Sequence, residues 1–360
     1  MEGAGGGLPA TTAALARQRE AGLHPGACVV ASLDAEPAGT AGVGGVGPGT
    51  VVPWFSMTKV TVALRVAMAW EAGALALDDP VARFLPDFVA GGKAAVTVRH
   101  LLTHTGGFRS ADAARPLDDW DAETARICGA RLETGWVPGR TAGYSARAAA
   151  HVLAEVVRRS CADSRPWDRI VAEDVLAPLG MERSTLAGPP PDTTAMYDTS
   201  TREARVLTDR RGPVAPGASG RGPVEEVARL MECLYLGGAP LLTPVTVEAM
   251  TARHRTGLFD KTFGAVLDWG LGLIVDAKVH GQAVVPYGFG AVAGPRTYGH
   301  GGSQSSGMLC DPEAGLVAVL ACTGMPGEAA HARRAHEVWT ALYDDLGLVD
   351  PGDPGRRGRD

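Results

Sequence analysis

The sequence predicts a mixed α/β (α+β) fold in which an antiparallel sheet is built from both ends of the chain and is flanked by helices. Two observations indicate this fold. Short strand-like apolar runs occur near both termini, and the long stretch between them has mainly helical periodicity. We therefore expect a mainly helical domain inserted into the sheet domain. The seam between these two parts is the expected place for a functional pocket.

Apolar runs bounded by turn residues predict the strands. Residues 27–33 (ACVVASL) form the first strand, and a Gly-rich turn region continues from there to Thr50. A second apolar stretch, 51–55, leads into a helix that is apolar on nearly every face and ends near Gly73. Further strands are predicted at 269–275, 308–310 and 316–322.

Amphipathic periodicity predicts helices at 146–158, 167–176, 224–236 and 329–346. The segment 187–223 is polar and rich in Gly, Pro and Arg, which is typical of a mobile surface loop.

The whole pattern predicts one folded unit at residues 10–348. Its sheet subdomain comprises residues 10–60 and 262–348, and its helical subdomain comprises residues 61–261. Residues 349–360 are predicted to be a flexible C-terminal tail, because they continue neither pattern.

Composition excludes several classes of function. The 360 residues carry a net charge of −6, which argues against nucleic acid or an anionic membrane as the main partner. The sequence has no run of 18 apolar residues, and its Gly-rich N-terminus does not resemble an export signal, so a cytoplasmic location is predicted. The six cysteines lack paired spacing and are expected to be reduced thiols. The oligomeric state is not predicted.

Ser56 and Lys59 form the most informative pattern, because the chain has 12 serines but only four lysines. They lie three residues apart at the start of the apolar helix, so the amine can reach the hydroxyl and take its proton. The helix dipole and burial both disfavour the ammonium form, which predicts a lowered pKa for Lys59. The backbone N–H of Ser56 would stabilise an oxyanion at the helix N-terminus.

Two further segments attract attention. In residues 143–146 (GYSA), Tyr144 lies at a loop-to-helix junction and, taken alone, is more simply a packing residue. Residues 299–303 (GHGGS) contain paired glycines beside a predicted strand. Such glycines either allow a ligand to approach the backbone closely or form a simple turn.

In this order, the three segments resemble the motifs of the serine β-lactamase-related family, which includes class C β-lactamases, D-alanyl-D-alanine peptidases, esterases and acyltransferases. The resemblance extends from about residue 24 to residue 346 and includes 101–107 (LLTHTGG) and 178–181 (PLGM). It implies a β-lactamase/transpeptidase-like fold whose chemistry needs no metal and no organic cofactor.

The resemblance also implies a role for each motif residue. Ser56 would be the acylated nucleophile, Lys59 its base, and Tyr144 the residue that shuttles a proton to or from the leaving group. The backbone N–H groups of Ser56 and Ser303 would form the oxyanion hole. A nearby Lys59 cation would favour the ionised form of Tyr144 and so lower its pKa. The third motif implies three substrate-binding residues, His300, Gly301 and Gly302.

The second motif departs from the family pattern, which usually reads Tyr-x-Asn, because Ala146 stands at the asparagine position. Alanine cannot hold a substrate amide, and this disfavours efficient β-lactam hydrolysis. Ala146 and Trp136 are nevertheless predicted to border the bound substrate. Trp136, in the loop before the motif, either lines the pocket mouth or packs in the core. His100 and His104 have the spacing of metal ligands but lack a third ligand, so no metal is expected, and His104 should hydrogen-bond a loop.

These observations predict a serine acyl-enzyme catalyst that acts on an ester or a similar small-molecule acyl donor. Transfer to water would make it an esterase, and transfer to an amine or alcohol would make it a transacylase, as are some relatives in small-molecule biosynthesis. The alternatives are a β-lactamase or D-alanyl-D-alanine peptidase and, from another class, a non-catalytic binding protein on the same fold.

Overall fold

The computed structural model describes residues 6–113, 116–201, 203–207, 213–281 and 284–348, so the predicted tail at 349–360 lies outside the described residues. The helices are α1 (Pro9–Glu20), α2 (Lys59–Glu71), α3 (Val98–Leu102), α4 (Trp120–Gly129), α5 (Ala148–Ser160), α6 (Trp167–Val171), α7 (Val224–Tyr235), α8 (Pro244–Thr251) and α9 (Glu328–Asp345). The short helical turns are η1 (Phe55–Thr58), η2 (Val81–Arg83), η3 (Pro86–Gly92), η4 (Arg109–Asp112), η5 (Ala172–Leu176) and η6 (Lys278–His280). The strands are β1 (Gly6–Gly7), β2 (Ala27–Leu33), β3 (Glu36–Val43), β4 (Val51–Pro53), β5 (Met196–Asp198), β6 (Arg205–Leu207), β7 (Arg221–Pro223), β8 (Phe259–Asp260), β9 (Ala265–Val266), β10 (Asp268–Trp269), β11 (Ile274–Val275), β12 (Tyr298–Gly302), β13 (Ser306–Asp311), β14 (Leu316–Cys322) and β15 (Gly324–Met325).

The main sheet has eight strands in the order β1-β3-β2-β14-β13-β12-β11-β10. Within this sheet, among the residues that the structure describes, only the β1–β3 pair is parallel. The two ends of the chain meet at the centre, where β2 and β14 pair antiparallel along their whole lengths. The predicted fold class, an antiparallel sheet built from both termini with helices around it, is therefore confirmed.

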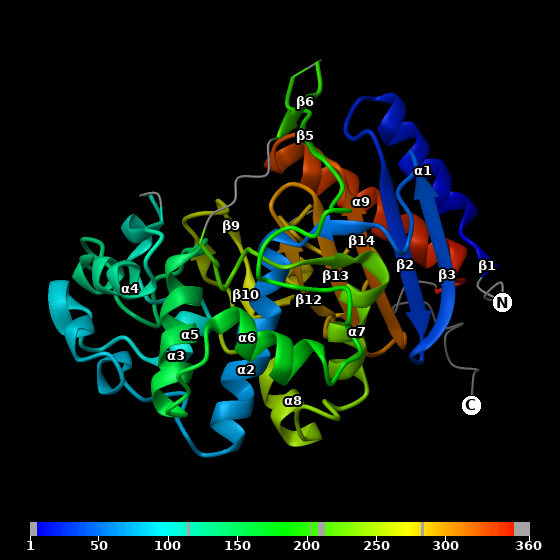
Figure 1. Ribbon diagram of the computed structural model, residues 1–360. Helices are drawn as coiled ribbons and strands as arrows, with labels where there is room; N and C mark the ends of the chain where they lie inside the picture. The colour runs from blue at the N-terminus through cyan, green and yellow to red at the C-terminus, as the bar shows by residue number, and fades with distance from the viewer. Residues whose placement is uncertain (1–5, 114–115, 202, 208–212, 282–283, 349–360) are drawn as a thin grey trace.

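Helices cover both faces of this sheet (Figure 1). On one face α1 and α9 pack together, and their apolar side chains share a cluster with the sheet. On the other face α7 packs against β2, β13 and β14, and its cluster continues into α2 and α5. The helix α7 lies within residues 61–261, the stretch predicted as the helical subdomain. Part of that stretch therefore packs on one face of the sheet.

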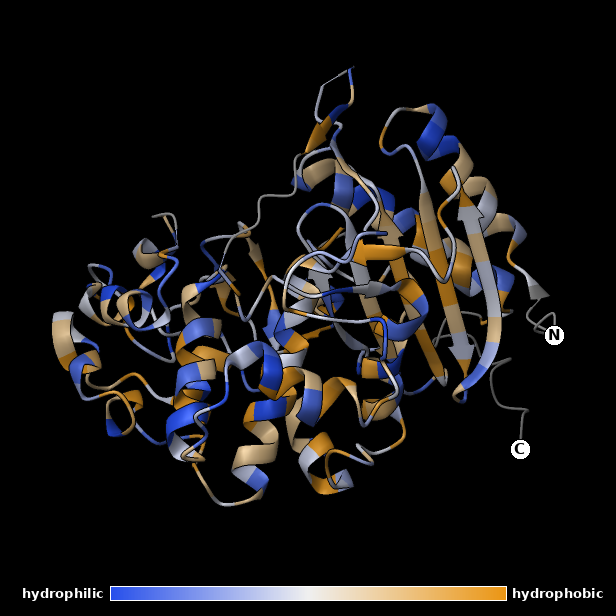
Figure 2. Cartoon of the chain, in the orientation of Figure 1, coloured by the Kyte–Doolittle hydropathy of each residue, from blue (hydrophilic) through white to orange (hydrophobic). Residues whose placement is uncertain are grey.

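The central strands are apolar because both of their faces are covered. Every residue of β14 is buried, and so are the first six of β2. Figure 2 shows both strands mainly in the hydrophobic colour. A continuous apolar run is the expected pattern for a strand without a solvent-facing side.

Within the described ranges, no helix combines the length and the apolarity needed to cross a bilayer.

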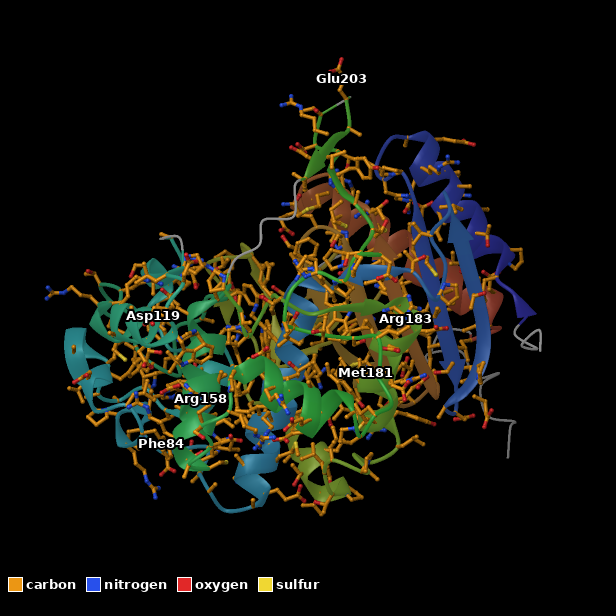
Figure 3. The ribbon with its side chains drawn as sticks, viewed as in Figure 1. Phe84, Asp119, Arg158, Met181, Arg183 and Glu203 are labelled. Carbon is orange, nitrogen blue, oxygen red and sulfur yellow. The ribbon has the colours of Figure 1, made fainter. Side chains whose placement is uncertain are left out.

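Three local predictions were wrong. The stretch 269–275 is a hairpin, because β10 and β11 pair antiparallel around a turn in which Gly272 has a φ of +78°. Residues 36–43, predicted as a turn region, form β3, whose pairing with β2 outweighs its low intrinsic strand preference. The predicted loop at 187–223 contains the β5–β6 hairpin, and Figure 3 shows Glu203 at the tip of this projecting segment.

Candidate active site

Ser56 lies in the short turn η1, directly before the buried helix α2. The preceding residue, Phe55, has a φ of +47°, a left-handed conformation that residues with a side chain rarely adopt. His104, Tyr287 and Gln304 share this conformation, with φ values of +54°, +56° and +51°, while Asp34, Ala35 and Ala162 adopt it in turns elsewhere. Strained residues of this kind persist only where the surrounding structure holds them, and they cluster at functional sites.

Lys59, the first residue of α2, is buried, and its amine has three partners. Its Nζ lies 2.7 Å from the Ala146 carbonyl oxygen, 3.1 Å from that of Gly217 and 3.0 Å from Ser56 Oγ. Because carbonyl oxygens only accept hydrogen bonds, two N–H groups of the amine are directed at them. The position facing Ser56 is then left for the lone pair of the neutral amine. This arrangement can accept the Ser56 proton.

The charge state of Lys59 fits this geometry. Burial lowers the pKa of Lys59 to about 7, against an opposing effect of the Asp112 charge, so the predicted lowering is confirmed. Asp112 also accepts hydrogen bonds from the backbone N–H groups of Ala146 (2.9 Å), Arg147 (3.0 Å) and Ala148 (2.7 Å). It therefore fixes the segment whose carbonyl oxygen holds the Lys59 amine.

Tyr144 lies over Lys59, with the Nζ atom 5.0 Å from the centroid of its ring. Its main chain is held at both polar atoms. The N–H donates to Asp260 Oδ1 at 3.1 Å, and the carbonyl oxygen accepts from Thr262 Oγ1 at 2.9 Å. Asp260 is itself fully buried and paired with Arg255 at 2.8 Å. A buried ion pair thus positions the backbone of the second motif.

The pKa of Tyr144 contradicts the expectation from the sequence. The neighbouring Lys59 cation was predicted to lower it, but burial raises it, and the proximity of Ser56 offsets this only in part. The Tyr144 hydroxyl is buried and has no well-formed hydrogen bond to any of the described residues. The phenol therefore stays protonated near neutral pH, which suits a proton donor rather than a base.

An aromatic wall supports Tyr144 from one side. The ring of His104 lies 4.5 Å from the Tyr144 ring and 4.5 Å from Trp269, and Phe263 lies 4.9 Å from Tyr144. His104 Nδ1 also accepts from the Ser145 N–H at 3.2 Å, so its predicted hydrogen bond to a loop is confirmed. Sequence reasoning missed Phe263, because no motif or spacing relates it to the other residues.

His300 is buried on β12 and carries no charge. Burial, aided by Lys59, lowers the pKa of His300 to about 3. Its Nδ1 donates to the Gly301 carbonyl oxygen at 2.7 Å, so Nε2 is the acceptor nitrogen. That atom is buried without a hydrogen-bond partner among the described residues. The third motif therefore adds no positive charge beside Ser56.

The glycines of the third motif allow β12 to lie against the turn that carries Ser56. A Cβ added to Gly302 would lie 2.5 Å from the Trp54 carbonyl oxygen, and one added to Gly301 would meet the Tyr287 ring at 1.8 Å. Ser303 follows directly in the turn between β12 and β13. The structure thus brings the first and third motifs together, as the predicted oxyanion hole requires.

Two other predicted substrate contacts have different surroundings. Ala146 is exposed, and its carbonyl oxygen holds Lys59. Trp136 is instead 4% exposed and occupies the interior position that the sequence left as an alternative. Its indole fills the space above Gly107, where a Cβ would meet the ring at 2.2 Å, and its Nε1 donates to the Thr105 carbonyl oxygen at 2.9 Å.

Comparisons with known proteins identify the family and the fold. A family model described as Beta-lactamase matches residues 12–343. The esterase EstB of Burkholderia gladioli is 28% identical over 263 residues, which are 61% of this chain and 64% of EstB, so the chain spans just under two thirds of that relative. A putative D-alanyl-D-alanine carboxypeptidase of Escherichia coli (strain K12) is 27% identical over 316 residues, 76% of this chain and 68% of that relative.

Solved structures share the fold at low sequence identity. A penicillin-binding protein homolog from Caulobacter crescentus superposes with a TM-score of 0.77 at 24% identity, over 94% of this chain and 97% of the homolog. EstCE1, described as a hydrolase with promiscuous acyltransferase activity, superposes with a TM-score of 0.78 at 19% identity, over 93% of this chain and 98% of EstCE1.

Proposed function

Because the chain belongs to the β-lactamase family, a family of serine hydrolases, we propose that it forms an acyl-enzyme on Ser56 and acts on an ester or a similarly activated acyl group. The observation that carries this proposal is the arrangement around Lys59. Two carbonyl oxygens hold its N–H groups, and its remaining position faces Ser56 Oγ at 3.0 Å.

In the first half-reaction, Lys59 Nζ takes the proton of Ser56 while Oγ bonds to the acyl carbon. The developing oxyanion accepts hydrogen bonds from the backbone N–H groups of Ser56 and Ser303. The bond to the leaving group then breaks, and the leaving-group oxygen takes the proton of Tyr144. Lys59 passes its proton to the tyrosine oxygen, which restores both residues. The acyl group remains on Ser56.

The second half-reaction determines the type of enzyme. Attack by water would make the protein an esterase, and attack by an amine or alcohol would make it a transacylase. EstB is named an esterase, and EstCE1 is described as a hydrolase with promiscuous acyltransferase activity, so both outcomes fit relatives of this chain. We propose the hydrolytic reaction as the basal activity and transfer as its extension to a bound acceptor.

Two features favour a neutral ester over a β-lactam or a peptide carboxylate. Ala146 offers no carboxamide to a substrate amide, and the uncharged His300 offers no cation to a carboxylate. We propose the cytoplasm as the compartment, because all six cysteines are free thiols and five of them are buried. The alternative, a D-alanyl-D-alanine peptidase or β-lactamase, draws support from the name of the Escherichia coli relative.

Intact-protein mass spectrometry tests the proposal. The protein is exposed briefly to a p-nitrophenyl ester and, separately, to a penicillin, with Ser56→Ala as the control. We expect an ester-derived adduct that is absent from the variant and that decays faster when an accepted amine or alcohol is added. An adduct from penicillin alone would favour the β-lactam alternative. A folded protein that forms no adduct with either reagent would favour a non-catalytic binding protein.

A further inference from the structure

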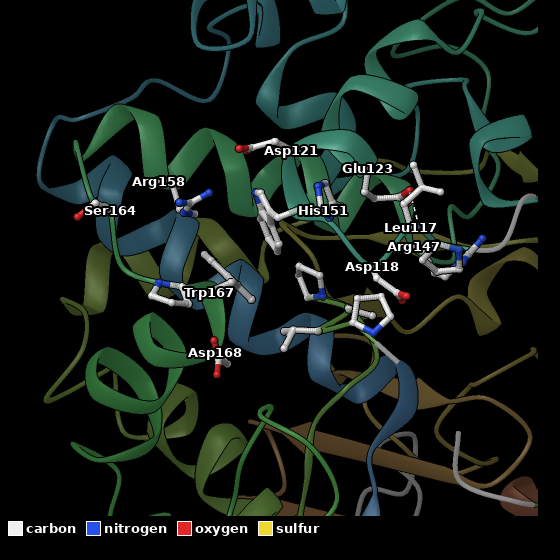
Figure 4. A pocket seen from close by; sticks show the side chains of 18 residues that line it. Leu117, Asp118, Asp121, Glu123, Arg147, His151, Arg158, Ser164, Trp167 and Asp168 are labelled. Carbon is white, nitrogen blue, oxygen red and sulfur yellow. Dashed lines mark hydrogen bonds between the residues drawn. The ribbon is translucent and has the colours of Figure 1, made fainter. Parts of the chain in front are cut away.

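A cavity of about 380 Å³ lies beside the candidate site, between the loop at 116–118, the helices α4 and α5, the loop at 164–166 with the start of α6, and the loop at 213–217. Figure 4 shows the side chains that surround it, with His151 and Arg158 reaching it from α5 and Trp167 from α6. Its volume falls in the range of pockets that bind small organic ligands. None of the three motifs lies in its wall.

The cavity adjoins the catalytic lysine. Gly217 lines the cavity, and its carbonyl oxygen accepts from Lys59 Nζ at 3.1 Å. Arg147, another lining residue, directly follows Ala146, whose carbonyl oxygen accepts from the same amine at 2.7 Å. Both carbonyl groups that hold Lys59 therefore belong to segments that border the cavity.

The residues proposed to act on the leaving group lie outside the cavity. Tyr144, the proposed donor to the leaving group, packs against His104, Phe263 and Trp269, and its ring lies 6.2 Å from that of His300. None of these rings lines the cavity. A leaving group beside Tyr144 would therefore place the acyl chain on the Gly217 side of Lys59, toward the cavity.

The wall formed by α4 and α5 has little unsatisfied polarity to offer a ligand. Trp120 Nε1 donates to Glu155 Oε2 at 2.8 Å, and Arg158 pairs with the same carboxylate at 2.8 Å. His151 Nε2 is paired with Thr124 Oγ1 at 2.8 Å, and burial lowers the pKa of His151 to about 4. This wall can therefore recognise a ligand mainly by apolar contact.

The rest of the lining points to an uncharged, bulky occupant. Apolar side chains face the cavity from the three loops, and Leu117 is 42% exposed at its edge, which is high for a leucine. Asp118 and Asp121 also line it, are exposed, and form no ion pair within the part of the chain that the structure describes. The lining as a whole has four carboxylates, of Asp118, Asp121, Glu123 and Asp168, against two arginines, Arg147 and Arg158, and this net negative charge disfavours an anionic chain.

We infer that this cavity binds the acyl chain of the substrate and selects a bulky, uncharged, branched or aromatic acyl group over acetyl. The inference rests on the proposed function, because it requires the acyl group to be attached to Ser56. It adds the substrate class, which neither the motifs nor the relatives specify.

The test compares two esters with the same leaving group, p-nitrophenyl 2-naphthoate and p-nitrophenyl acetate. The quantity measured is the ratio of their kcat/KM values. Ala215→Trp fills the cavity from the 213–217 loop, and Ser164→Trp fills it from the opposite loop, where the native side chain is exposed. The matched control is Val245→Trp on α8, which is 75% exposed and outside the cavity. Circular dichroism verifies that each variant is folded.

We expect the wild-type ratio to favour the naphthoate and to fall about tenfold or more in either filling variant, with no change in the control. An unchanged ratio in both folded filling variants overturns the inference. So does a variant that retains naphthoyl acylation but loses transfer to an aromatic amine, because the cavity would then hold the acceptor.

Calorimetric binding of 2-naphthamide, a neutral analogue without an activated leaving group, separates this inference from the proposed function. If no ester acylates Ser56, the proposed function fails. Binding of the amide that is lost in Ala215→Trp would still support the cavity as a site for a neutral aromatic group. Equal binding in wild type and Ala215→Trp would count against it.

Discussion

Two of the four lysines, Lys59 and Lys93, are buried, with exposed fractions of 5% and 0%. The two environments are closely similar. Each amine has three oxygen partners, and each lies 5.0 Å from the centroid of an aromatic ring, Tyr144 for Lys59 and Phe88 for Lys93. Burial lowers the pKa of both amines.

The difference is the third partner. Lys93 donates to three carbonyl oxygens, those of Ala90 (2.7 Å), Cys128 (2.9 Å) and Ala130. A carbonyl only accepts, so Lys93 needs all three of its protons to satisfy its partners. Lys59 has a hydroxyl in that place, which can donate as well as accept. The comparison teaches that burial alone does not make a lysine a base, because a partner able to give up a proton is also required.

Exchanging each lysine for methionine tests the comparison most severely. We expect Lys59→Met to slow acylation by about 10² to 10⁴, the usual effect of losing an acid–base group. Lys93→Met should instead lower stability, by about 1 to 3 kcal/mol for each buried carbonyl left without a donor. Adduct formation by mass spectrometry and urea unfolding measure the two effects. A folded Lys93→Met protein that no longer acylates would contradict the assignment.

Tyr144→Phe makes the surroundings of Lys59 more like those of Lys93, because it keeps an aromatic ring and removes the hydroxyl. We expect turnover of an alkyl ester to fall by about 10² to 10⁴, since the departing alkoxide needs a proton. A p-nitrophenyl ester should be less affected, because its phenolate leaves without one. Parallel kinetics on both esters measure the difference. Near-normal turnover of the alkyl ester would show that Tyr144 is not the donor.

The pH dependence sharpens the comparison further. The amine of Lys59 accepts a proton only in its neutral form, so acylation should rise as the pH increases through about 7. The Asp112 carboxylate raises the pKa of Lys59, so Asp112→Asn should move this rise to lower pH. Asp119→Asn, which changes the capping residue of α4 instead, is the matched control. An identical profile in all three proteins would exclude Lys59 as the titrating group.

The smallest effect is expected for Ala146→Asn, which leaves the carbonyl contact with Lys59 and adds a carboxamide beside it. One new hydrogen bond to a substrate amide is worth up to about tenfold in rate. The ratio of penicillin acylation to ester acylation should therefore rise by no more than that amount. If the ratio is unchanged, Ala146 does not set the preference for esters.

Much of the fold and of the candidate site follows from local patterns. The strands at 27–33 and 316–322 were predicted with the observed bounds, because a strand buried on both faces is a continuous apolar run. The glycine-containing strand β3 and the turn at Gly272 were missed, since only pairing with neighbouring strands defines them. The raised pKa of Tyr144 was missed for a related reason, because burial depends on residues far away in the sequence.

The sequence by itself determined the pair Ser56 and Lys59, because residues three apart at a helix start must lie on one face. Only the tertiary structure decided how the amine is used. The carbonyl groups that hold it belong to Ala146 and Gly217, which are 87 and 158 residues away from Lys59. No local pattern specifies contacts at that separation. The direction of the Lys59 lone pair is therefore a property of the folded chain.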